Sequence, residues 1–175
     1  QKFMMQFLIM KRFANNYPID YLPLRGEDLP ARMAAFDTVF SMRGKIGYVF
    51  KTGDEDIPVY ELYRLGGINT LRGLRDVGPK YPDSDDVKGG NSMLCFNFDY
   101  IFPLIKSAGM KGVIFFDTGN AWDNEYDITD MRETVGVGIR WYSPIGPLRL
   151  EWGYVLDKKE DDSPSRWEFT IGMFQ

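Results

Sequence analysis

Large apolar side chains alternate with smaller or polar ones along several long stretches of this chain. Between residues 94 and 102, every second residue is Leu, Phe or Tyr, while Cys95, Asn97 and Asp99 lie between them. Successive side chains of a β-strand point to opposite faces of its sheet, so this period of two gives each strand one apolar and one polar face. The pattern predicts an all-β, antiparallel protein, and the same period recurs at 40–50, 135–141, 148–156 and 167–173.

The alternation, together with the turn residues between stretches, predicts seven strands in one domain that spans residues 1–175. Several of these strands are about ten to twelve residues long. Strands of soluble sheets usually have about 5–6 residues, whereas a tilted membrane strand needs about 9–11. The expected strands lie at about 2–13, 37–51, 91–102, 111–122, 131–142, 147–156 and 165–174.

Two architectures fit this pattern, a soluble β-sandwich and a transmembrane β-barrel. A sandwich packs the apolar faces of two sheets together and needs no detergent, whereas a barrel turns its apolar face to lipid. Aromatic residues cluster near the strand ends, and the polar faces carry glycines and charges of both signs. The connection at 143–146 is short, while those at 123–130 and 157–164 are longer and acidic. These features favour the barrel.

Composition excludes several classes of function. The chain has no histidine and a single cysteine, Cys95, so Ser-His-Asp and Cys-His catalysis and cysteine zinc cages are ruled out. A net charge of −4 argues against nucleic-acid binding. Asp99 and Asp117 could form a carboxylate pair, but an arginine nearby would keep both ionised, which does not favour a general acid. We expect no enzymatic activity, no metal site and no cofactor.

The chain resembles a known family in several separated motifs, which occur in the family's order. The motifs are GGINTLRGLRDVGPK, GGN at 89–91, FFDTGNAWD, VGVGIRWYSPIGPLRLEWGY and RWEFTIGMF. They resemble the C-terminal half of the BamA-type outer-membrane β-barrel assembly (insertase) family, within the bacterial surface antigen superfamily. The match covers about residues 36–174; residues 14–36 fit the strand scheme poorly and have no functional account.

The resemblance implies a functional site in the long loop at 52–90. In the family, a Leu-Arg-Gly-Leu type of motif lies at the tip of an extracellular loop that folds into the barrel lumen. Carried over, Arg72 would pair with Asp117 and with Asp99. A buried arginine is costly unless it is paired, and its planar fork suits a carboxylate, which supports this assignment. The motif also includes Leu74, and tight turns or close approaches are expected at Gly66, Gly67, Gly73 and Gly119.

The resemblance also implies a function, which is the folding and insertion of β-barrel proteins into the outer membrane of a diderm bacterium. A seam beside the last strand would admit substrate strands, and Gly172 would weaken packing there. Two-partner secretion, or a translocation-and-assembly pore of the same superfamily, is the alternative. The residues expected in the seam strand are Trp167, Phe169, Ile171, Gly172 and Phe174.

The implied partners are the remaining N-terminal barrel strands and POTRA domains, neither of which this chain contains, assembly-machinery lipoproteins, unfolded outer-membrane proteins and the lipid bilayer. Seven strands leave two open edges, and unpaired backbone groups in lipid are costly. Three ways of removing these edges stay open at this point. The chain completes a larger barrel, closes as a small barrel with 14–36 as an eighth strand, or dimerises edge to edge.

Overall fold

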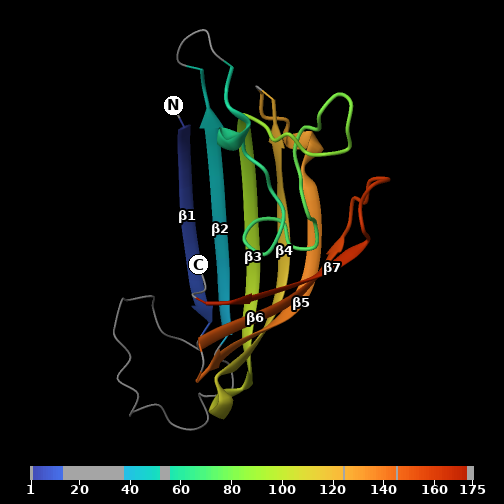
Figure 1. The fold of residues 1–175 in the computed structure, drawn as a ribbon. Helices are drawn as coiled ribbons and strands as arrows, with labels where there is room; N and C mark the ends of the chain where they lie inside the picture. Colours follow the sequence, from blue (N-terminus) through green and yellow to red (C-terminus); the bar gives the residue numbers. More distant parts are fainter. Residues whose placement is uncertain (1, 14–37, 52–55, 124, 145, 173–175) are drawn as a thin grey trace.

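Seven long antiparallel strands form one sheet, in chain order, in the computed structural model of this protein (Figure 1). The structure describes residues 2–13, 38–51, 56–123, 125–144 and 146–172. The strands are β1 (Lys2–Phe13), β2 (Thr38–Val49), β3 (Ser92–Ile105), β4 (Met110–Trp122), β5 (Arg132–Ser143), β6 (Gly146–Val155) and β7 (Ser165–Ile171). Three single 3-10 turns complete the described elements, η2 (Val59–Glu61), η3 (Lys106–Ala108) and η4 (Ile128–Asp130). No helix within these ranges is long and apolar enough to cross a membrane.

All seven predicted strands are present, with bounds within a few residues of those expected. The largest differences are at the end of β3, which continues to Ile105, and at the end of β7, which stops at Ile171. Gly172 follows the strand with a φ of 131° and donates its backbone N–H to the carbonyl oxygen of Pro147 at 2.9 Å. Gly172 was expected within the last strand and instead follows it, while its effect on packing at the seam stays a prediction. Residues 14–36 and Phe174 lie outside the described residues.

The described sheet is open. β1 pairs only with β2, and β7 pairs only with β6, so each has one unpaired edge within the described residues. The sheet is strongly curved, and β6 and β7 run across the direction of β1–β4 (Figure 1). The curvature gives the sheet an inner face, against which the loop between β2 and β3 lies, and an outer face.

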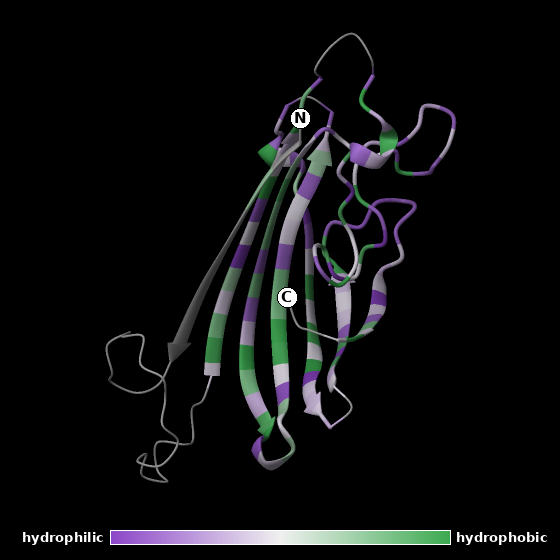
Figure 2. Ribbon diagram, turned by 60° about the vertical axis from the view of Figure 1, so that its left-hand side comes forward, coloured by the Kyte–Doolittle hydropathy of each residue, from purple (hydrophilic) through white to green (hydrophobic). Residues whose placement is uncertain are grey.

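Hydrophobic and hydrophilic residues alternate along the described strands (Figure 2), and the hydrophobic side chains that point to the outer face of β4–β7 are exposed. Ile114 is 47% exposed and Val137 is 49% exposed, and the aromatic and aliphatic residues of β7 are exposed to a greater extent. Such a large contiguous apolar surface does not face water in a stable monomer. The two apolar faces that a sandwich would stack are not packed together here. The exposed apolar side chains of β4–β7 include Ile114, Val137, Ile139, Trp141, Leu150, Tyr154, Trp167, Phe169 and Ile171.

The inner face holds the buried core, and much of that core is contributed by the loop. Leu65, Leu71, Leu74 and Val77 of the loop pack with residues of the strands in one buried hydrophobic cluster. The strand residues of this cluster are Val49, Met93, Cys95, Ala121 and Val155. Polar strand residues on the same face are buried as well, since Asp117, Thr134 and Glu151 have no exposed surface. The polar faces of the strands are thus the buried ones, the reverse of a soluble sandwich.

Candidate functional site

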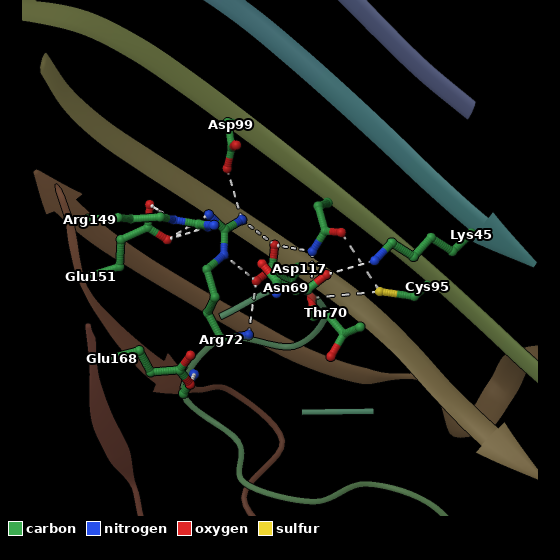
Figure 3. A network of polar contacts seen from close by, with 12 residues as sticks. Lys45, Asn69, Thr70, Arg72, Cys95, Asp99, Asp117, Arg149, Glu151 and Glu168 are labelled. Carbon is green, nitrogen blue, oxygen red and sulfur yellow. Dashed lines mark hydrogen bonds and ion pairs between the residues drawn. The ribbon is translucent and has the colours of Figure 1, made fainter. Parts of the chain in front are cut away.

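The described part of the loop between β2 and β3, residues 56–91, folds as a compact unit on the inner face. Isolated bridges fasten it to itself, at Tyr63 with Gly90, Leu65 with Val77 and Lys80 with Val87. Its innermost part, residues 66–76, is called the loop tip below. The tip reaches the middle of the sheet and contacts β2, β3, β4, β6 and β7, as Figure 3 shows for the polar contacts.

The loop tip is a tight turn that depends on glycine. Thr70 accepts a hydrogen bond from the Gly66 N–H and donates one to the Gly66 carbonyl, both at 2.7 Å. Gly66 has a φ of 127°, and a Cβ there would lie 2.1 Å from the Arg75 carbonyl oxygen. Gly73 has a φ of 97°, in the region that favours glycine. The tip therefore folds sharply enough to direct Arg72 into the sheet.

Arg72 is 1% exposed and is held by Asp117 of β4 at three points. Its Nε donates to Asp117 Oδ2 at 2.7 Å, its Nη2 donates to Oδ1, and its backbone N–H donates to Oδ2 at 3.1 Å. Arg72 Nη2 also lies 2.8 Å from Asp99 Oδ1 of β3. Its guanidinium carbon lies 3.7 Å from the centre of the Phe115 ring. The structure thus brings together Arg72, Asp117 and Asp99, the three residues that the resemblance implies.

A third carboxylate, Glu151 of β6, completes the site, and sequence reasoning did not select it. Arg72 Nη1 donates to Glu151 Oε2 at 3.0 Å. Arg140 of β5 and Arg149 of β6 also donate to Glu151, at 2.9 Å and 2.7 Å from their Nε atoms. Arg140 donates to Asp99 Oδ2 as well, at 3.0 Å. We call these six residues the tip network: Arg72, Asp99, Asp117, Arg140, Arg149 and Glu151.

Charge balance explains how the tip network is tolerated in a buried place. It contains three arginines and three carboxylates, and each carboxylate accepts from or lies against at least one arginine. Burial alone would lower the pKa of Arg72, but the negative charges of Asp117, Asp99 and Glu151 raise this pKa above its ordinary value. The guanidinium therefore stays charged, and the site acts as an electrostatic clamp.

The loop tip touches the last two strands through Gly73. A Cβ on Gly73 would lie 2.8 Å from the carbonyl carbon of Gly153 in β6, and a Cβ on Gly153 would lie 2.6 Å from the Arg72 carbonyl oxygen. Two glycines thus allow the backbones of tip and wall to meet directly. The Gly73 N–H donates to Glu168 Oε1 of β7 at 3.1 Å. Glu168 is a second residue that sequence reasoning did not select.

On the β2 and β3 side, the tip is held by hydrogen bonds to its backbone carbonyls. Lys45 donates to the Asn69 carbonyl at 3.1 Å. Asn97 donates to the Thr70 carbonyl and, at 2.8 Å, to Asp117 Oδ1. Cys95 has no exposed surface and lies beside Thr70.

The other residues selected from sequence fall in three places. Leu74 is buried in the core, and Gly67 lies in the tip with a φ of 78°. Gly119 lies inside β4, where a Cβ would come within 2.6 Å of the Leu94 carbonyl oxygen, so it permits close approach of two strands. Asp117 lies in mid-strand, so it does not begin a turn. Trp167, Phe169 and Ile171 project from β7 on the uncovered outer face.

A second group of ion pairs lies among the loop and the segments that follow β4 and β6, one pair joining the loop to the segment after β6 and the other joining the two segments to each other. Lys80 Nζ lies 2.6 Å from Asp161 Oδ2, and Lys159 Nζ lies 3.2 Å from Asp130 Oδ1. Their side chains are between 42% and 63% exposed. A cavity of about 1120 Å³ lies among these segments. We call the two pairs the mouth pairs.

Comparisons with known proteins agree on the relationship of this chain. The sequence model of the Omp85 superfamily domain matches residues 30–174. Over 139 residues the chain is 36% identical to outer membrane protein assembly factor BamA of Nitratidesulfovibrio vulgaris, a match that spans 75% of this chain and 18% of that protein. A stretch of 41 residues is 61% identical to tRNA U34 carboxymethyltransferase of Hahella chejuensis, but it covers 23% of this chain and 13% of that enzyme, too little to indicate a family.

The fold resembles that of a solved barrel. The crystal structure of BamA from Haemophilus ducreyi lacking POTRA domains 1–3 superposes with a TM-score of 0.73 and 22% sequence identity. The superposition covers 98% of this chain and 35% of that one. The likeness confirms the predicted fold class, an antiparallel all-β sheet of the kind that forms this membrane barrel. The described chain corresponds to part of that barrel.

Proposed function

Because this chain belongs to the Omp85 superfamily, we propose that it forms the C-terminal part of an outer-membrane assembly factor of the BamA type, which helps other β-barrel proteins fold into the membrane. The chain spans about a fifth of the length of the curated BamA relatives that it matches. Its activity is therefore proposed for the complete protein. The proposed location is the outer membrane of a Gram-negative bacterium.

The observation that carries this proposal is the combination of an apolar outer face with a charged and glycine-lined inner face braced by the loop tip. An outer face of this kind suits the hydrocarbon core of a bilayer. A buried guanidinium with three carboxylate partners on β3, β4 and β6 ties the strands of the wall to the loop. The wall is thereby stiff in the middle, and β7 remains as an edge.

The proposed mechanism uses that edge. The unpaired backbone N–H and carbonyl groups of an edge strand can pair with an incoming strand by β-augmentation. β7 forms its ladder with β6 alone among the described residues, and its outer side chains are apolar. A substrate strand added there would place its own apolar face toward lipid. No chemical step is required, so we propose a protein without enzymatic activity and without a cofactor or metal.

The proposed partners follow from the same reasoning. The remaining barrel strands and the POTRA domains would complete the membrane and periplasmic parts, and assembly-machinery lipoproteins would join the complex. Unfolded outer-membrane proteins would be the substrates. The relatives named BamA support a role within such a machinery, and the individual partners belong to the proposal.

The test is an assembly assay with two arginine variants of the same loop. The full-length protein is reconstituted in liposomes, an unfolded β-barrel substrate is added, and folding is followed by heat-modifiable migration. We expect Arg72→Ala to slow assembly strongly. Arg75→Ala is the matched control, because the Arg75 side chain is 84% exposed and pairs only with the neighbouring Asp76, at 3.4 Å, among the described residues.

Equal assembly rates for wild type, Arg72→Ala and Arg75→Ala would contradict the proposal, as would growth of a depletion strain on the Arg72→Ala protein without any defect. Ion conductance together with export of one dedicated partner, in the absence of substrate folding, would identify a secretion pore of the same superfamily instead.

A further inference from the structure

The register of β5, β6 and β7 places like charges directly opposite each other on the inner face. Arg140 of β5 lies opposite Arg149 of β6, and Glu151 of β6 lies opposite Glu168 of β7. Side chains at such positions have Cβ atoms about 4.5–5.5 Å apart, and like charges there destabilise the strand pair. Both glutamates are buried, so water screens their repulsion little. The charges of these two glutamates therefore need compensation from neighbouring groups.

The loop tip supplies that compensation on both sides. Arg72 donates to Glu151 at 3.0 Å, and the next residue, Gly73, donates its backbone N–H to Glu168 at 3.1 Å. Arg140 and Arg149 also neutralise Glu151. For Glu168, by contrast, the Gly73 N–H is the only hydrogen-bond donor recorded among the described residues. Two consecutive residues of the tip thus each donate to one of the two carboxylates that lie opposite each other across the β6–β7 pair.

The contact between Gly73 and Gly153 makes this arrangement sensitive to the position of the tip. The backbones of Gly73 and Gly153 are in direct contact because neither residue has a side chain, so the tip fits against β6 in one position. If the tip leaves that position, Glu151 loses Arg72 and Glu168 loses the Gly73 N–H in the same event.

We propose that the Glu151–Glu168 pair makes the pairing of β7 with β6 depend on the docked loop tip. With the tip seated, the two carboxylates are bridged and β7 is held in the sheet. With the tip displaced, their repulsion weakens the β6–β7 ladder and frees the edge strand. Glu168 is then a positioning residue that acts through β7. This coupling deepens the function proposed above, because β7 is the strand to which substrate would be added.

Amide hydrogen exchange on the full-length protein in detergent micelles tests the coupling without any substrate. Residues 146–155 have the same sequence in every variant used, so their exchange reports on the β6 side of the ladder, and residues 165–171 report on β7. We expect Arg72→Ala to raise exchange in both segments by about tenfold or more, because a hydrogen bond to a charged group and the bridging cation are lost together.

The decisive variant is Arg72→Ala combined with Glu168→Gln. Glutamine keeps the length and an acceptor oxygen but removes the like charge, so we expect exchange in 146–155 to return most of the way to the wild-type rate. The control is Arg72→Ala combined with Thr170→Ala, which alters the next inner-face residue of β7 and should rescue nothing. If Arg72→Ala fails to fold, Arg72→Lys, which keeps one charge but lacks the planar fork, serves in the same pair of double variants.

The inference is overturned if Arg72→Ala leaves exchange in 146–155 and 165–171 at the wild-type rate. It is also overturned if Glu168→Gln gives no more rescue than Thr170→Ala. These outcomes are independent of the assembly assay. A protein that shows the expected exchange and still folds no substrate would contradict the proposed function and leave the coupling in place.

Discussion

The tip network and the mouth pairs are two sets of ion pairs to which the loop between β2 and β3 contributes, through Arg72 and Lys80, and they differ chiefly in exposure. Arg72, Asp117 and Glu151 have side chains at most 2% exposed, whereas those of the mouth pairs are at least 42% exposed. Breaking a buried pair leaves an uncompensated charge and costs about 3–5 kcal/mol, while an exposed pair is typically worth about 0–1 kcal/mol. The difference in burial indicates that the tip network holds the loop on the sheet, whereas the mouth pairs add little to that stability.

The largest effect is expected for Arg72→Ala. This change leaves Asp99, Asp117 and Glu151 buried without the cation that contacts all three, so we expect the free energy of unfolding to fall by about 3–5 kcal/mol. Urea unfolding in detergent, followed by tryptophan fluorescence, measures it. Arg75→Ala should unfold like the wild type. Equal midpoints for the two variants would show that the buried pairs of Arg72 stabilise the fold no more than the exposed Arg75 does.

The next largest effect is expected for Glu151→Gln. Glutamine preserves the shape but weakens the contacts with three arginines, and hydrogen bonds to charged groups are worth about 1.5–3 kcal/mol. The loss of stability should be of that order in the same urea experiment. Glu133→Gln is the control, since Glu133 is exposed on β5. A loss no greater than that of the control would show that Arg140 and Arg149 do not need Glu151.

A smaller loss of stability is expected when a side chain is introduced where the loop tip contacts β6. In Gly153→Ala the new Cβ meets the backbone of Arg72 and Gly73, which cannot rotate away, so we expect destabilisation of about 1–3 kcal/mol. In the control, Gly112→Ala, the new Cβ meets only the ring of Phe102, which can move. Limited proteolysis of the loop should increase for the first variant alone. Similar behaviour of both would indicate that the tip tolerates displacement.

The smallest effect is expected at the mouth. The hydrogen bond that Lys80 donates to Asp161 raises the pKa of Lys80 above its ordinary value. Its small stabilising contribution is therefore present below about pH 10.4, the ordinary value, and is lost as the pH rises above that. The difference between wild type and Lys80→Ala should also vanish in about 1 M salt, where the Debye length is about 3 Å. Urea midpoints measure this difference. If wild type and Lys80→Ala still differ in this salt, the mouth pairs stabilise the protein in the same way as the buried tip network.

Much of the fold could be predicted because the evidence for it is local. Each strand carries its own alternation, so its approximate bounds and the faces of its side chains can be predicted from a few neighbouring residues. The end of β7 was misjudged because Gly172 continues the period in sequence while its positive φ ends the strand in space. The pairing of Arg72 with Asp117 and Asp99 came from the family resemblance, and the alternation alone does not lead to it.

Glu151 and Glu168 illustrate what sequence reasoning missed. The alternation puts both on the polar face, together with Arg140 and Arg149, but many charged residues share that face. Identifying Glu151 and Glu168 as site residues requires knowing which strands the loop tip contacts on the inner face of the sheet. Arg72 and Glu151 are 79 positions apart in the chain, and Gly73 and Glu168 are 95 apart.

The sequence by itself determined that this protein is built from long two-faced strands, because side chains of a strand alternate with a period of two whatever surrounds them. It also determined that histidine and cysteine-cage chemistry is absent, since the residues are not there. Only the tertiary structure decided that the polar faces are the buried ones and that three carboxylates converge on one guanidinium. Those outcomes depend on the curvature of the sheet and on the path of the loop, which are set by contacts between residues far apart in the chain.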